Sequence, residues 1–187
     1  MKLLKKTLGI TLLFVMGLSL FGCDKLTLAK KPDLFSTENL IKAAEDRDYE
    51  EYEDSQIFLK QVGDMVKDGH GYYVAEDEEE AQYFYDVLIN RLGTFDDYDV
   101  VDFTIVSAGD DAQEYFFLVT FEDEDDAEDF YDECCDRTTD EDSTDDYEYA
   151  WTSIWTTKNK NQRMNAYFWS GDKVLYSVAI GSDLEDY

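Results

Sequence analysis

The chain has 187 residues, and its 45 Asp and Glu against 16 Lys and Arg give a formal net charge of −29 at pH 7. Such a chain offers no basic surface to phosphates, so nucleic-acid binding is not expected. An aromatic content of 16% argues against a disordered acidic tail. The length predicts one domain, with cations, cationic proteins or neutral ligands as the expected partners.

Residues 1–22 have the layout of a signal peptide. Three lysines precede an apolar run from Leu8 to Leu20 that is short for a membrane span. The run ends in Leu20-Phe21-Gly22-Cys23, which resembles the lipobox of bacterial lipoproteins. The resemblance implies cleavage before Cys23, lipidation of its thiol and anchoring on the extracytoplasmic face of the cell membrane. An ordinary secretory peptide and an uncleaved N-terminal helix are the alternatives.

Residues 23–35 predict a lipidated N-terminus and a short tether, which contains the one proline of the chain. Residues 36–187 are expected to form a single acidic α+β domain. A helix is predicted over 36–48, because Ser36 or Thr37 can cap it and apolar residues recur on one face. A second helix is predicted over 55–71, and a strand over 71–77.

An internal repeat is the most informative pattern in the body of the chain. Residues 76–86 read EDEEEAQYFYD and residues 122–132 read EDEDDAEDFYD, with seven of eleven positions identical. Each copy follows an apolar strand and places Ala, Phe and Tyr at helical spacing. Asp77 and Asp123 occupy the position expected of a helix N-cap in their copies. Both copies therefore predict a strand-to-helix junction.

The segment between the two copies alternates apolar residues on both sides of a polar, Gly-containing turn, which predicts a hairpin. The combined order, strand–helix–strand twice, predicts a ferredoxin-like βαββαβ core. Residues 138–148 are expected to be a polar loop. Strands over 149–157, 163–169 and 174–180 are expected to follow as a C-terminal antiparallel meander that extends the sheet.

The acidic loop has part of the pattern of a calcium site. Asp140, Asp142, Thr144, Asp146 and Glu148 alternate as the oxygen ligands of an EF-hand loop do. The sixth position is Asp145 in place of Gly, and the twelfth is Trp151 in place of Glu. We therefore expect a solvated acidic loop without a specific metal site, and no cofactor.

The vicinal pair Cys134-Cys135 lies on the apolar side of the second repeat helix. Buried thiols that pack as small hydrophobic groups are expected there. An oxidised pair, within the chain or between chains, is the alternative, because disulfides persist outside the cytoplasm. His70, the one histidine, is expected in an exposed turn between two glycines.

Aromatic residues of the tail are the candidate ligand-binding residues. Tyr149, Trp151 and Trp155 share one face of a predicted strand, and Tyr167 and Trp169 share one face of the next. Such a strip is either a platform for a sugar or a partner peptide, or core beneath a helix. Residues 158–163, KNKNQR, form a basic island beside it.

The expected function is a non-enzymatic binding or interaction module, anchored to the membrane through Cys23, with a protein or glycan partner. The body resembles small uncharacterised lipoproteins of Gram-positive bacteria, a resemblance that implies no particular activity. An extracytoplasmic hydrolase that uses carboxylates, or an acidic inhibitor of a cationic protein, are the alternatives. No GxSxG, P-loop or GxGxxG frame supports an enzyme.

Overall fold

The structure, a computed structural model, describes residues 35–56, 70–91, 95–108, 113–137, 143–147, 149–156 and 162–181. The helices are α3 (Thr37–Glu45), α5 (Glu78–Phe84), the π-helix η1 (Tyr85–Ile89) and α6 (Glu124–Asp136). The strands are β1 (His70–Val74), β2 (Val100–Ala108), β3 (Gln113–Phe121), β4 (Ser143–Tyr147), β5 (Ala150–Thr156), β6 (Gln162–Ser170) and β7 (Lys173–Gly181).

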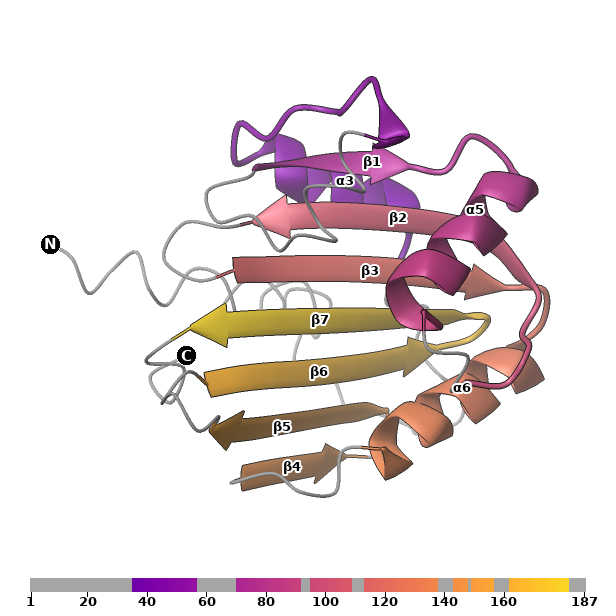
Figure 1. Ribbon diagram of the computed structural model, residues 1–187, viewed down its shortest axis with the longest axis vertical. Helices are drawn as coiled ribbons and strands as arrows, with labels where there is room; N and C mark the ends of the chain where they lie inside the picture. The colour runs from indigo at the N-terminus through magenta and orange to yellow at the C-terminus, as the bar shows by residue number, and fades with distance from the viewer. Residues whose placement is uncertain are drawn as a thin grey trace, which may run out of the picture.

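The strands form one antiparallel sheet of seven, in the order β1-β2-β3-β7-β6-β5-β4. Helices α5 and α6 lie in front of the sheet in Figure 1, and α3 lies behind it near β1 and β2. The described part of the chain is therefore three layers: two helices, the sheet, and one helix.

The predicted ferredoxin-like core with an appended meander is wrong, although the mix of elements fits an α+β fold. A ferredoxin-like core needs the strands before and after each helix to run parallel with another strand between them. Here β1 and β2 are antiparallel neighbours, with His70 opposite Ala108. The connection between η1 and β2 is long enough for β2 to return antiparallel to β1 and pair with it directly. On the other side, β3 pairs with β7, so the tail completes one continuous sheet.

Two predictions of local structure are confirmed. The helix predicted over 36–48 is confirmed as α3, and the Asn39 N–H donates to Ser36 Oγ at 3.1 Å. The predicted hairpin is confirmed as β2 and β3. The second predicted helix, over 55–71, lies outside the described residues except at 55–56 and 70–71, and it is wrong at 70–71, which begin β1. The polar loop expected over 138–148 is wrong at 143–147, because β4 pairs there with β5.

The sheet is buried on both faces, which explains the near-continuous apolar sequence of β3. Tyr115, Phe117, Val119 and Phe121 face α5 and α6, while Phe116 and Leu118 face the α3 side. The repeat supplies the helix side of the front core, with these residues at most 5% exposed: Ala81, Phe84, Tyr85, Ala127, Phe130 and Tyr131. The predicted burial of the repeat's Ala, Phe and Tyr is confirmed.

Candidate functional site

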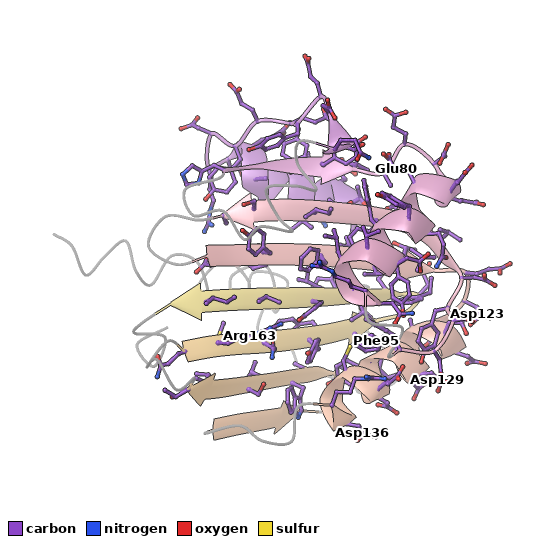
Figure 2. The ribbon with its side chains drawn as sticks, in the orientation of Figure 1. Glu80, Phe95, Asp123, Asp129, Asp136 and Arg163 are labelled. Atoms are coloured by element: carbon purple, nitrogen blue, oxygen red, sulfur yellow. The ribbon has the colours of Figure 1, made fainter. Side chains whose placement is uncertain are left out.

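The most distinctive surface of the described domain is the solvent side of the two front helices, which we call the acidic helix face. Figure 2 shows carboxylates projecting outward from this layer, with Asp129 and Asp136 on α6. Their exposed acids are Glu78, Glu79 and Asp86 on α5 and η1, and Glu124, Asp125, Glu128, Asp129, Asp132 and Asp136 on α6. Neither helix has a basic residue in its last turn.

Each helix is fixed at its start by an aspartate, as the repeat predicted. The Glu80 N–H donates to Asp77 Oδ1 at 2.9 Å, and the Asp126 N–H donates to Asp123 Oδ1 at 3.0 Å. These caps satisfy backbone donors that a helix start leaves unpaired. In the first copy the Glu76 N–H also donates to Glu80 Oε2, at 2.9 Å. Both helices are thereby held with their apolar side on the sheet and their acidic side in water.

The charge on α6 opposes the helix dipole at its far end. Acids near a helix start are favourable, whereas acids in the last turn cost roughly 0.3–1 kcal/mol each at an exposed site. Asp132 and Asp136 occupy the last two turns without a basic neighbour until Arg137. The Arg137 guanidinium pairs with Glu133 and lies 4.3 Å from the centre of the Phe95 ring. Local helix stability therefore does not explain this run of acids.

Crowding of like charges shows at the start of α6. Partial burial, and then the carboxylates of Asp123, Asp99 and Asp129, raise the pKa of Asp126. The neighbouring loop approaches the same helix, because the Tyr98 hydroxyl donates to Glu133 Oε2 at 3.1 Å. The acidic helix face is therefore a region of strong negative potential that attracts cations and cationic groups.

The candidate ligand-binding aromatics lie in the core instead of on the surface. Trp151 is 6% exposed, and Tyr167 and Trp169 are each 5% exposed. The Trp169 ring stacks on Tyr131 of α6 with centroids 5.9 Å apart, and Trp151 stacks on Tyr167 at 5.8 Å. Of the two interpretations of the strip, core beneath a helix is the one these three residues fit. The side chain of Trp155 lies outside the described residues.

The two adjacent cysteines are both present as thiols and not as a disulfide. Cys134 is 1% exposed and packs among the aromatic rings of the front core, while Cys135 is half-buried. Burial, followed by the nearby Cys135 and Glu133, raises the pKa of the Cys134 thiol well above its usual value. A thiol with a raised pKa is a poor nucleophile, so Cys134 is suited to packing and not to catalysis.

His70 was expected in a turn but is the first residue of β1, and its ring stacks on Tyr49 with centroids 5.3 Å apart. In the acidic loop, 140, 142 and 148 lie outside the described residues, and 144 and 146 belong to β4. Cys23 and most of the basic island lie outside them as well. In the described ranges, no group of three His, Cys, Asp or Glu side chains is arranged to hold a metal ion.

A polar network missed by the sequence analysis lies on the front face of β6 and β7. Arg163 donates through Nε to Asn165 Oδ1 at 3.1 Å and through Nη2 to Tyr176 Oη at 3.2 Å. Figure 2 labels Arg163 on the sheet away from α6. Asn165 is 4% exposed and lies opposite Ser153 of β5. A polar residue within an apolar strand was the available signal, but its partners depend on strand register.

Comparisons with known proteins assign no family. No family model matches the chain, and no curated protein matches it. Among solved structures, the extracellular domain of PknH from Mycobacterium tuberculosis is similar at 14% identity and a TM-score of 0.41. That match covers 79% of this chain and 88% of the other. At these values, the similarity assigns no function. No helix in the described ranges is long and apolar enough to cross a membrane.

Proposed function

We propose that this protein is an extracytoplasmic binding module, lipid-anchored to the cell membrane through Cys23, that engages a cationic partner through the acidic helix face. The observation that carries the proposal is the series of exposed acidic side chains on α5 and α6. On α6 the series extends to the last turn, where negative charges interact unfavourably with the helix dipole. Features that cost local stability without a structural benefit are most often functional.

Electrostatic complementarity gives this surface a defined role. A cationic protein would be steered toward it over roughly one Debye length, about 8 Å at physiological ionic strength. The buried state of Trp151, Tyr167 and Trp169 leaves those rings little area for a glycan. Charge therefore supports a protein partner better than a sugar, and a binding or inhibitory role better than hydrolysis.

Two quadruple variants of equal net charge test the surface. The first neutralises α6 with Glu124→Gln, Asp125→Asn, Glu128→Gln and Asp129→Asn, all exposed positions outside the cap. The control neutralises four exposed acids around α3 and the following loop: Glu38→Gln, Glu50→Gln, Glu51→Gln and Glu53→Gln. Binding to a lysine-rich peptide and to a basic folded protein is measured by calorimetry at low and high salt.

We expect the α6 variant to lose about tenfold or more in affinity at low salt, and the control to lose much less. Equal losses in the two variants would mean that net charge, and not this face, governs binding. No binding of either probe by the unmodified protein would refute the cationic-partner proposal. The anchor is tested separately: Cys23→Ala is expected to abolish palmitate labelling and release the protein from the membrane fraction.

A further inference from the structure

The sheet face opposite the acidic helix face is covered by α3 at one end only. The core on this side joins Leu40 and Ala44 of α3 to side chains of β1, β2 and β3, and it reaches Leu175 of β7, with Phe168 of β6 packed against it. Beyond it lies a set of apolar side chains on β5, β6 and β7 that we call the rear apolar face. Its members are Ile154, Met164, Ala166, Phe168 and Ala179.

Three of these side chains are shielded from water, and Ile154 and Phe168 are half-buried, although no helix in the described ranges lies over them. Met164 is 7% exposed, and Ala166 and Ala179 are each 2% exposed. A sheet interior on this face can reach such values only when another layer packs on it, because sheet neighbours shield a side chain laterally and not from above. The rear apolar face therefore needs a cover that the described residues do not supply.

The path of the chain into α3 indicates which segment provides the cover. The Thr37 hydroxyl is 3.3 Å from that of Thr104 on β2, whereas the Phe35 ring packs edge-on against Phe168 of β6 at 6.2 Å between centroids. Thr104 and Phe168 lie in one row across the sheet, through Leu118 and Leu175. Followed backwards from Thr37, the chain thus runs across the strands toward β6 and the rear apolar face.

Length and sequence agree with this direction. Residues 24–34 span up to about 36 Å when extended, whereas β7 to β5 is about 10 Å wide. Lys25-Leu26-Thr27-Leu28 alternates polar and apolar residues, the pattern of an extended segment with one buried side. Residues 57–69 are a weaker candidate, because both of their ends are fixed near the β1 edge, where Glu51 bridges Tyr72.

We propose that the tether, residues 24–34, docks along the rear apolar face with Leu26 and Leu28 buried, and so fixes how the domain is oriented on the membrane. The inference rests on the proposed lipid anchor. Because α5 and α6 cover the opposite side of the sheet (Figure 1), docking turns the rear face toward the bilayer and the acidic helix face outward. Repulsion between the acidic surface and an anionic leaflet favours the same orientation.

Limited proteolysis of the full protein, extracted from membranes in detergent, tests the docking. Trypsin cleavage after Lys30 is followed by mass spectrometry in the unmodified protein, in Leu26→Ser/Leu28→Ser and in the control Thr27→Ala, whose side chain would face water. Docking predicts cleavage about tenfold or more faster in the double variant than in the other two, because proteases cut the released segment. Thermal unfolding of the double variant is measured alongside, so that only a folded domain is compared.

A second variant approaches the contact from the sheet. Ala179→Asp places a carboxylate on the rear apolar face and is expected to accelerate the same cleavage, with thermal unfolding measured to confirm a folded domain. Rapid cleavage in the unmodified protein, equal to that of the double variant, would overturn the docking, and so would slow cleavage in all variants. A change from dimer to monomer in Ala179→Asp, with cleavage unaltered, would assign the face to a second copy instead.

Failure of docking and failure of the anchor give different results. Rapid cleavage in a protein that carries palmitate and stays in the membrane fraction refutes docking and leaves the anchor intact. Slow cleavage in a protein that carries no lipid refutes the anchor alone.

Discussion

The helix cap at Asp123 gives a prediction whose magnitude follows from the structure. Asp123 accepts the backbone N–H of Asp126 at 3.0 Å, and its negative charge adds to that of the surrounding acids. Two substitutions separate these effects. Asp123→Asn removes the charge and keeps an oxygen that can accept the bond, whereas Asp123→Ala removes both.

Losing the cap and losing the charge of Asp123 change the free energy of unfolding for different reasons. Loss of a cap costs about 1 kcal/mol, within a range of roughly 0.5–2. Loss of the charge forfeits about 0.3–1 kcal/mol of favourable interaction with the helix dipole, but relieves repulsion with neighbouring acids, including the carboxylate of Asp126. We therefore expect Asp123→Asn to be nearly neutral and Asp123→Ala to be about 1 kcal/mol less stable than Asp123→Asn.

Urea unfolding followed by far-UV circular dichroism measures this difference, and thermal unfolding should show a melting temperature lower by about 2–4 °C. The pair Asp77→Asn and Asp77→Ala repeats the comparison in the first copy, where Asp77 accepts the Glu80 N–H at 2.9 Å. Equal stability of the Asn and Ala variants at both positions would refute the claim that these aspartates act as hydrogen-bonding caps.

Two further predictions concern titration and thiol reactivity. The raised pKa of Asp126 means that protonation is easier in the folded than in the unfolded state, so this group favours folding as the pH falls through that raised value. We expect the melting temperature to rise as the pH is lowered from 7.5 through that raised value, and to rise with added salt; a fall on both changes would contradict charge repulsion. Because Cys134 is 1% exposed with a raised pKa, a thiol reagent at pH 8 should label Cys135 first and Cys134 at the rate of unfolding. Comparison of Cys134→Ala with Cys135→Ala assigns the two phases, and equally fast labelling of both would show that Cys134 is not buried.

The two copies of the repeat contribute unequally to the acidic helix face. The positions that are identical in the two copies include the aspartate that caps the helix and the Ala, Phe and Tyr that pack on the sheet. After Phe84 the first copy continues as the π-helix η1, whereas the second remains α-helical to Asp136. The Tyr85 hydroxyl reaches the carbonyl of Asp96 at 3.3 Å, which ties this turn to the returning loop. The longer helix therefore carries most of the acidic surface.

The sequence alone determined the local structure of this domain. Capping residues and helical spacing act within a few positions, so Ser36, Asp77 and Asp123 identified three helix starts. Apolar residues on both sides of a polar, Gly-containing turn also identified β2 and β3, because the burial of a strand leaves apolar residues in the sequence itself.

Only the tertiary structure decided which strands are neighbours and which side chains meet. The repeat carries no information on whether β2 returns beside β1, because that depends on the connection after η1 and on the insertion of β7 beside β3. The same pairing buries Trp169 against Tyr131 of α6 and Trp151 against Tyr167. It also joins Arg163 to Tyr176 across two strands. Contacts between residues far apart in the chain depend on strand order and register, which local patterns do not encode.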